Sequence, residues 1–254
     1  MRWRTTLLAE VLALWLSASG AQAGEFTVLS AGAMKTIVTE LAEEFRRETG
    51  HTMKATFSPV GVQRKKLEAG ERADIVILTD AVIDQLAGQG LVRPGSRTDI
   101  ARTGMGVCVR RGAALPDIST AEALKQCLLA AKSVVYVDPA QGATSGVHFA
   151  GVLQRLGIAE AVKPKTVLVQ GGFAADVVAK GEAEMCAHQI SEIVPVAGVT
   201  LVGPLPRELQ KVTTYSAGLP ASAEVPEVAR AFIAFMTRPE FKARLAVAGL
   251  DYRE

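Results

Sequence analysis

Two histidines in this sequence could bind an anion or transfer a proton. His148 lies three residues after Ser145, in the first turn of an expected helix, and His188 ends an expected strand beside Gln189. Because imidazole titrates near neutral pH, either ring could donate to an anion or transfer a proton. A structural, hydrogen-bonded role is the alternative for both. If the chain is an enzyme, His148 is the residue to test, and we assign no other catalytic residue.

Small polar residues gather at four junctions between an expected strand and the helix that follows. In open α/β sheets, ligands bind beyond the carboxyl ends of strands, and helix N-termini there offer free N–H groups to anions. Each junction alone could be ordinary turn and capping chemistry. Together they predict an anion-binding cleft. The expected binding residues at these junctions and beside the two histidines are Ser30, Gly32, Ala33, Ser58, Gly61, Thr144, Ser145, Gly146, His148, Gly172 and Gln189.

Arg102 and Thr103 stand where the chain passes between two sets of expected elements, and we add them to the binding residues. A guanidinium at this point could hold a carboxylate through two parallel hydrogen bonds. An ion pair between the two sets is the alternative use of Arg102.

Common catalytic and cofactor motifs do not occur in the sequence. It has no HExxH, no GxxxxGK[ST] loop, no GxSxG elbow and no GxGxxG after a strand, and its three histidines do not form a zinc pattern. We therefore expect no metal and no cofactor. The near-neutral charge also argues against nucleic acid as a partner, because such proteins usually carry a basic stripe.

Short β-branched runs alternate with helical patterns along the chain. Apolar residues recur at helical spacing from Met34 to Phe45, and Gly50 ends that pattern. Strand–helix alternation predicts an α/β protein with parallel strands and helices on both faces of each sheet. Strands are expected near 26–29, 53–57, 75–78, 105–110, 133–137, 166–169, 184–187, 199–202 and 211–217.

The pattern divides into two similar α/β sets with no flexible linker between them. We predict two lobes joined by two crossovers, near 100–104 and 211–214. Lobe 1 would be discontinuous, from 24–102 plus 214–254, and lobe 2 would span 103–213. We expect a monomer.

Residues 1–23 have the pattern of a secretory signal peptide. A basic start, Met1-Arg2-Trp3-Arg4, precedes a short apolar run, and Ala21-Gln22-Ala23 supplies small residues for cleavage after Ala23. The apolar run is shorter than the roughly 20 residues of a membrane span. An uncleaved membrane anchor is the alternative. The pattern predicts a protein that works outside the cytoplasm.

The three cysteines leave at least one thiol unpaired. We expect Cys108 and Cys186 to be buried free thiols in strands, with a Cys108–Cys186 disulfide as the alternative. A catalytic thiol is not expected, because no histidine is placed locally to activate one.

Several segments resemble the periplasmic molybdate-binding family over essentially the whole mature chain. They are Thr27-Val28-Leu29-Ser30-Ala31-Gly32-Ala33-Met34, Leu67-Glu68-Ala69-Gly70, Ala73-Asp74-Ile75-Val76-Ile77, Asp138-Pro139 and Leu153-Gln154-Arg155-Leu156-Gly157. The resemblance implies a periplasmic type II binding fold, with two mixed sheets flanked by helices and an oxyanion held between helix N-termini. Ala33 and Gly61 stand where the family's molybdate binders carry serine hydroxyls.

Other segments resemble a divergent branch of this family that includes periplasmic aconitate isomerases. They are Arg102-Thr103-Gly104-Met105-Gly106-Val107, Ser145-Gly146-Val147-His148-Phe149 and Gln189-Ile190-Ser191-Glu192. Two functions follow from the resemblance. The first is a periplasmic solute-binding protein that captures a small anion, an oxyanion or an organic carboxylate, for an ABC-type membrane transporter. The second is an isomerase of aconitate or a similar tricarboxylate.

Overall fold

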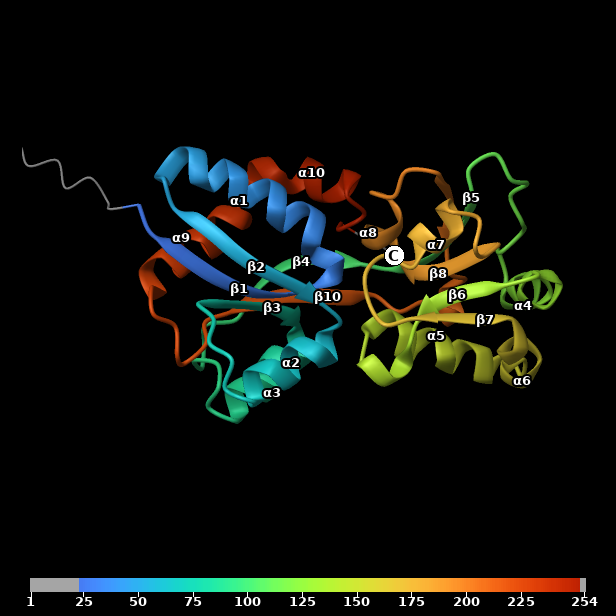
Figure 1. Cartoon of the computed structure of the whole chain (residues 1–254), viewed down its shortest axis with the longest axis horizontal. Helices are drawn as coiled ribbons and strands as arrows, with labels where there is room; N and C mark the ends of the chain where they lie inside the picture. Colours follow the sequence, from blue (N-terminus) through green and yellow to red (C-terminus); the bar gives the residue numbers. More distant parts are fainter. Residues whose placement is uncertain (1–22, 252–254) are drawn as a thin grey trace, which may run out of the picture.

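The computed structural model describes residues 23–251, which form two five-stranded sheets side by side along the long axis (Figure 1). The strand order is β2-β1-β3-β10-β4 in the first sheet and β7-β6-β8-β5-β9 in the second. The first sheet contains β1 (Glu25–Ala31), β2 (Thr52–Ser58), β3 (Ile75–Thr79), β4 (Thr98–Thr103) and β10 (Thr213–Gly218). The second contains β5 (Met105–Arg110), β6 (Val134–Val137), β7 (Thr166–Val169), β8 (Met185–Gln189) and β9 (Val199–Pro204).

Both sheets are mixed, and they share one pattern of strand directions. In the first sheet β1 pairs in parallel with β2 and β3, while β10 runs antiparallel to β3 and β4. In the second sheet β6 pairs in parallel with β7 and β8, while β5 runs antiparallel to β8 and β9. The predicted α/β class with two mixed sheets is confirmed. The edge strand β4 was expected only as a crossover.

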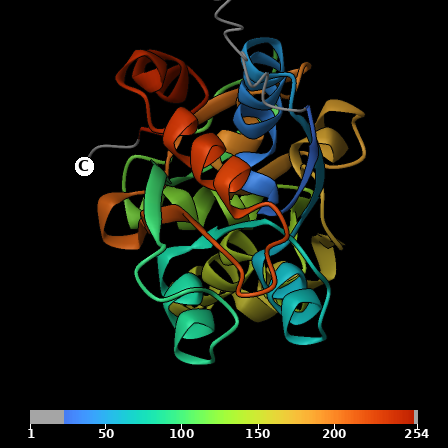
Figure 2. The same ribbon diagram turned by 90° about the vertical axis from the view of Figure 1, so that its left-hand side faces the viewer.

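Helices cover both faces of each sheet. Seen end-on, α1 (Lys35–Thr49), α9 (Pro226–Met236) and α10 (Lys242–Val247) lie on one side of the first sheet, and α2 (Val60–Glu68) and α3 (Asp80–Gly88) lie on the other (Figure 2). The second sheet is accompanied by α4 (Ala121–Ala130), α5 (Thr144–Arg155), α6 (Ala159–Val162), α7 (Ala175–Ala179) and α8 (Ile190–Ile193). The remaining helical turns are η1 (Gly32–Met34), η2 (Pro139–Gln141), η3 (Lys163–Lys165), η4 (Arg207–Leu209) and η5 (Pro239–Phe241).

Local sequence explains how α1 is placed against its sheet. Its buried residues, Ile37, Val38, Leu41, Ala42 and Phe45, follow the helical period and face inward. Gly50 ends the helix in the left-handed conformation at φ +79°, which glycine adopts without steric cost. The apolar face therefore fixes the start of α1 at the carboxyl end of β1.

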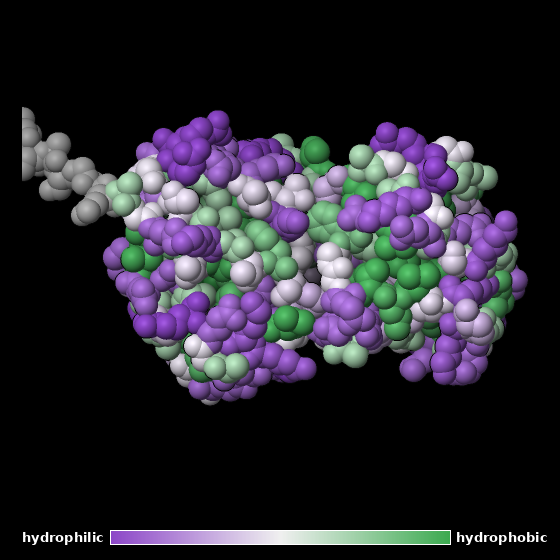
Figure 3. All heavy atoms as spheres, viewed as in Figure 1, coloured by the Kyte–Doolittle hydropathy of each residue, from purple (hydrophilic) through white to green (hydrophobic). Residues whose placement is uncertain are grey.

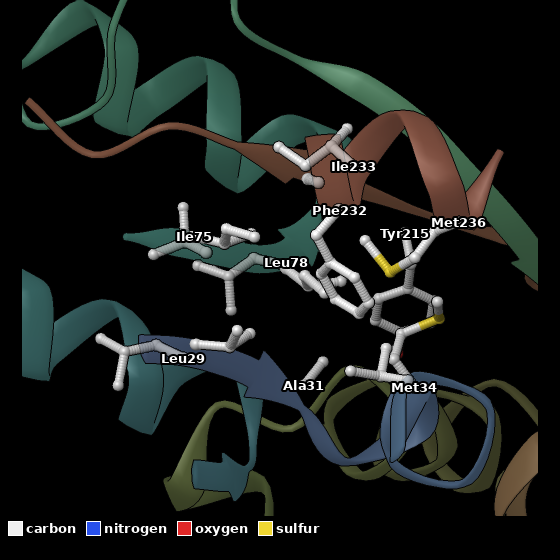
Figure 4. Close-up of a cluster of buried hydrophobic side chains, with 14 of the residues drawn as sticks. Leu29, Ala31, Met34, Ile75, Leu78, Tyr215, Phe232, Ile233 and Met236 are labelled. Carbon is white, nitrogen blue, oxygen red and sulfur yellow. The ribbon is translucent and has the colours of Figure 1, made fainter. Parts of the chain in front are cut away.

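Each sheet has its own hydrophobic core. One core cluster draws residues from 26–101 and from 215–250, and two further clusters draw only on residues 105–209. Figure 4 shows members of the first cluster, including Ile75, Leu78, Tyr215 and Phe232. Four residues of β3, Ile75 to Leu78, are buried, as a central strand covered on both faces requires. We call each sheet with its helices a half of the molecule. The lobe boundaries given above stay a prediction.

The chain crosses between the halves twice, from β4 to β5 and from β9 to β10. A third contact comes from the segment after α10. The amide of Arg102 donates to the carbonyl of Leu250 at 3.1 Å, and Gly249 lies against Ile190 and Ser191 at the start of α8. The end of the described chain therefore packs across the first crossover.

The described cysteines are free thiols. Cys108 and Cys186 are buried and lie directly opposite each other on β5 and β8, and Cys127 is half-buried. In the described part of the chain, 23–251, no helix is both long and apolar enough to cross a membrane. The signal peptide predicted for 1–23 lies almost entirely outside the described residues.

Candidate functional site

A cavity of about 160 Å³ lies between the two halves. Pale and green spheres, of intermediate to high hydropathy, gather at the waist between the halves in Figure 3. From the first half the cavity is lined by Ala31, Gly32, Ala33, Lys35, Phe57, Ser58, Pro59, Val60 and Tyr215. From the second half it is lined by Val137, Ala143, Thr144, Ser145, Gly171, Gly172, Phe173, Asp176, His188, Gln189 and Glu192.

The cavity lies at the carboxyl ends of strands in both halves. Ala31 and Ser58 are the last residues of β1 and β2 and pair with each other, and Val137 and Gln189 end β6 and β8. Parallel strands bring these ends to one edge of a sheet, which is where open α/β proteins bind ligands.

Two helices begin at the cavity without a side-chain cap. Pro59 precedes α2 and Ala143 precedes α5, and neither side chain accepts a hydrogen bond from the first turn. By contrast, the remote α4 is capped by Thr120, whose hydroxyl accepts from the amide of Ala123 at 3.1 Å. The first N–H groups of both helices are free of a side-chain cap, but at α2 the amide of Gly61 already donates to the carbonyl of Gly142 at 3.1 Å. The start of α5 is therefore the better place to bind an anion.

A buried histidine–carboxylate pair lines the same cavity. Nδ1 of His188 lies 2.9 Å from Oε2 of Glu192, and the two side chains are 1% and 9% exposed. The backbone N–H of Gln189 donates to the same Nδ1 at 2.9 Å. Nε2 of His188 is buried and has no hydrogen-bond partner within residues 23–251. The free nitrogen is thus the one not engaged by Glu192.

The contact with Glu192 determines what His188 can do. The two contacts of Nδ1 belong to different tautomers of the ring, because a protonated Nδ1 donates to Glu192 and an unprotonated Nδ1 accepts from Gln189. In the tautomer with the proton on Nδ1, the carboxylate holds the ring in place and Nε2 is left as a base. This is the arrangement by which a buried carboxylate orients a catalytic imidazole in hydrolases. The pair can therefore accept one proton at Nε2 and return it without a cofactor.

Glu192 belongs to the second half but reaches the first. A Cβ added at Gly32 would lie 2.8 Å from Oε1 of Glu192, so the carboxyl group sits directly against the start of η1. A side chain at Gly32 would push this carboxyl group away from its present place.

Tyr215 and Gln189 form a second polar group in the cavity. Nε2 of Gln189 is 3.5 Å from the hydroxyl of Tyr215 and 3.4 Å from that of Thr213, whereas its Oε1 has no partner among the described residues. Burial, with a contribution from the charge of Glu192, raises the pKa of Tyr215 well above its usual range. The phenol therefore remains protonated and can donate a hydrogen bond.

The structure gathers about half of the predicted binding residues around the cavity: Gly32, Ala33, Ser58, Thr144, Ser145, Gly172 and Gln189. The hydroxyl of Ser58 is buried without a partner in the described part of the chain. Three predicted residues lie just behind the lining. Ser30 bonds to the carbonyl of Ala31, Gly61 packs on Gly142, and Gly146 packs on the end of β6 at Val137.

Three predicted residues lie elsewhere, contrary to expectation. Nε2 of His148 is 2.7 Å from the carbonyl oxygen of Leu209, so the ring faces its own half instead of the cavity. Arg102 has an exposed side chain on β4, beside the segment that follows α10, and Thr103 is buried with its hydroxyl on the carbonyl of Gly104.

Several lining residues were missed from the sequence, and the polar ones among them are Lys35, Asp176, Glu192 and Tyr215. His188 was noticed but was not assigned to the site. The pairing of His188 with Glu192 gave no periodic signal, because His188 lies on β8 and Glu192 lies on α8, and the i, i+4 rule applies only within one helix. Tyr215 gave no such signal, since it comes from β10, far along the chain. Residues 23–251 contain no cluster of three histidine, cysteine or acidic side chains that could hold a metal ion.

The family of bacterial extracellular solute-binding proteins matches residues 26–251, and the chain belongs to this family. Members of this family are periplasmic. A curated relative is the aconitate isomerase of Pseudomonas sp, 32% identical over 230 residues that cover 88% of this chain and 86% of that protein. Another is the molybdate-binding protein ModA of Escherichia coli, 22% identical, covering 77% of each chain.

Solved structures show the same fold. The periplasmic molybdate-binding protein of Azotobacter vinelandii superposes with a TM-score of 0.74 at 20% identity, over 90% of this chain and 100% of that one. Peb3 of Campylobacter jejuni superposes with a TM-score of 0.65 at 16% identity, over 90% of this chain and 100% of that one. The predicted resemblance and the two-lobed binding-protein fold are confirmed.

Proposed function

We propose that the chain binds a small unsaturated polycarboxylate in the cavity and moves its double bond by proton transfer through His188. The observation that carries this proposal is the buried pair of His188 and Glu192, whose free Nε2 lines the cavity. A pure carrier needs donors for its anion and gains nothing from a carboxylate that orients a base.

The reaction is a proton shift along three carbons. Nε2 of His188 removes a proton from a methylene group next to the double bond, and the released electron pair spreads over the allylic carbons and the adjoining carboxylate. The same imidazolium then returns the proton to the far carbon of the allylic system, so atoms and electrons balance with no co-reactant. One positioned base performs both steps.

The surrounding groups favour the anionic intermediate. The uncapped start of α5 and the hydroxyl of Ser58 offer hydrogen bonds to a substrate carboxylate. The protonated phenol of Tyr215 is a further donor at the wall of the cavity. These donors come from both halves, so the substrate is held best when the halves are together.

The comparison with aconitate isomerase supports the substrate class. That relative is 32% identical over 88% of this chain. We therefore propose aconitate, or a tricarboxylate like it, as the substrate.

Carriage of a small anion to an ABC-type membrane transporter is the second candidate. It is favoured by membership of the solute-binding family and by relatives that are named as molybdate-binding proteins. In both proposals the chain works in the periplasm after cleavage behind Ala23.

Turnover of cis-aconitate separates the two candidates. The chain lacking residues 1–23 is incubated with cis-aconitate, and trans-aconitate is followed by chromatography, with His188→Ala and His148→Ala as matched variants. We expect conversion that is lost in His188→Ala and kept in His148→Ala. Absence of conversion by the unmodified chain, together with a thermal shift on an oxyanion or a dicarboxylate, would instead support the carrier.

A further inference from the structure

We propose that the ammonium group of Lys35 supplies the positive charge that a polycarboxylate needs in the cavity, by leaving the ring of Phe173 and binding one of the ligand's carboxylates. This inference rests on the substrate class in the proposed function and deepens it by naming the residue that recognises the ligand's charge. It concerns binding and does not require turnover.

Among residues 23–251, the cavity wall holds one permanent cation. The Lys, Arg, Asp and Glu side chains that line the cavity there are Lys35, Asp176 and Glu192. Taking several carboxylates out of water is costly unless an opposite charge pairs with them. With His188 neutral, as the proposed reaction requires, Lys35 is the lining side chain that can offset the ligand's charge.

Lys35 has no ion pair of its own within the described chain. Other lysines of the same half do have one, since Nζ of Lys54 lies 2.7 Å from the Glu25 carboxylate and Nζ of Lys66 lies 3.2 Å from that of Glu71. Nζ of Lys35 instead lies 5.7 Å from the centre of the Phe173 ring. Its ammonium group is therefore not committed to a carboxylate of the described residues.

The contact between Lys35 and Phe173 can be exchanged for a contact with a ligand. Both residues line the cavity, Lys35 from the start of α1 in the first half and Phe173 from the segment between β7 and α7 in the second. The Lys35 side chain is exposed, and a cation held over a ring at an exposed position is bound weakly. A charge-assisted hydrogen bond to a carboxylate is stronger, and the flexible lysine stem lets the ammonium group turn toward one.

The backbone at Lys35 is fixed while the end of its side chain is not. Ala33 and Met34 directly before it are buried, and Ile37 and Val38 after it pack in the core of the first half. Lysine and methionine have similar helix propensities, so Lys35→Met should fold normally and remove only the charge.

Calorimetric titration with tricarballylate tests the inference, because this ligand has three carboxylates and no double bond to move. Four chains lacking residues 1–23 are compared: the unmodified one, Lys35→Met, Lys35→Arg and Lys65→Met. Lys65 is the matched control, since it is an exposed lysine of the same half that does not line the cavity. We expect Lys35→Met to lose about tenfold or more in affinity, Lys35→Arg less than about threefold, and Lys65→Met less than about twofold.

Acetylation of lysine side chains in the unmodified chain gives a second measurement that depends on no variant. The chain is treated with an activated acetyl ester with and without saturating tricarballylate, and each site is followed by mass spectrometry. Bound ligand should slow acetylation of Lys35 and leave that of Lys65 unchanged.

An affinity of folded Lys35→Met within about threefold of the unmodified chain would overturn the inference. Equal acetylation of Lys35 with and without the ligand would do the same. Absence of tricarballylate binding by the unmodified chain would refute the polycarboxylate ligand and this inference together. Binding that is lost in Lys35→Met, without turnover of cis-aconitate by the unmodified chain, would refute the isomerase reaction alone.

Discussion

The starts of α1 and α2 both face the cavity, both follow a parallel strand, and both touch the second half across a glycine. At Gly32 the neighbour is the tip of a side chain, Oε1 of Glu192 at 2.8 Å from an added Cβ. At Gly61 the neighbour is backbone, with the carbonyl of Gln141 at 2.7 Å and Cα of Gly142 at 2.8 Å.

This difference indicates that one contact affects the reaction and the other affects how the two halves pack together. The contact at Gly32 brings a reactive group to the cavity and can shift, because a glutamate side chain is flexible. The contact at Gly61 brings no functional group and cannot shift without moving a strand–helix junction. We therefore expect changes at the α1 start to alter the reaction and changes at the α2 start to alter how well the halves meet.

The largest effect is expected at the carboxylate of the α1 contact. Glu192→Ala removes the group that orients His188, and we expect turnover of cis-aconitate to fall by about 100-fold or more. Initial rates measured by chromatography check this. Glu192→Gln should lose less than Glu192→Ala, because its amide oxygen can still accept from Nδ1. Equal rates for the unmodified chain, Glu192→Ala and Glu192→Gln would show that Glu192 has no role in the reaction.

The next largest effect is expected at the α2 contact. Gly61→Ala places a methyl group against fixed backbone, and such overpacking typically costs about 1–3 kcal/mol. We expect a lower melting temperature or a weaker affinity for tricarballylate, a saturated tricarboxylate, both measured by calorimetry. Gly151→Ala in α5 is the matched control, because an added Cβ there meets nothing within 4 Å. That control should gain stability, by about 0.5–1 kcal/mol.

A smaller effect is expected for Gly32→Ala. The added methyl displaces only the end of Glu192, so stability should change by less than about 1 kcal/mol, while turnover should fall by about tenfold as His188 loses its partner. Rates and melting curves on the same preparation test this. A large loss of stability with unchanged turnover would reverse the comparison between the two glycines.

The smallest effect on the reaction is expected for His148→Gln, because that ring contacts Leu209 and not the cavity. Burial lowers the pKa of His148 below its ordinary 6.5. Below pH 6.5 the unfolded chain then binds more protons than the folded one, so stability is full above that pH and declines as the pH falls.

His148→Gln should keep turnover of cis-aconitate within about twofold of the unmodified chain. Its free energy of unfolding should decline less between pH 7 and pH 5. Denaturant unfolding at several pH values, with rates at pH 7, measures both. A loss of turnover as large as that expected for His188→Ala would show instead that His148 takes part in the reaction.

Much of the fold could be predicted from the sequence because its signals are local. The buried run from Ile75 to Leu78 and the periodic face of α1 each specify their own element, and Gly50 fixes where α1 ends. The small residues at Ser58 and Thr144 likewise indicated two of the junctions that line the cavity. The number of sheets followed from the repeated alternation.

The site's chemistry was harder to predict because it depends on side-chain direction and distant pairing. His148 and His188 look alike in the sequence, yet the α5 start turns His148 toward Leu209 while β8 carries His188 into the cavity. Nothing local shows that Tyr215 lies beside Gln189, since strand pairing alone brings β10 into the first half. Arg102 was expected at the cleft because the crossover is there, but its strand directs the side chain to solvent.

The insertion of β10 between β3 and β4 has a consequence for biosynthesis. The first sheet cannot close until Gly218 has left the ribosome, and the segment that packs on α8 comes later still, at Gly249. Contacts between such distant residues form slowly, because a long loop must be ordered first. A nascent chain therefore lacks the finished cavity until synthesis has passed β10 and reached Gly249.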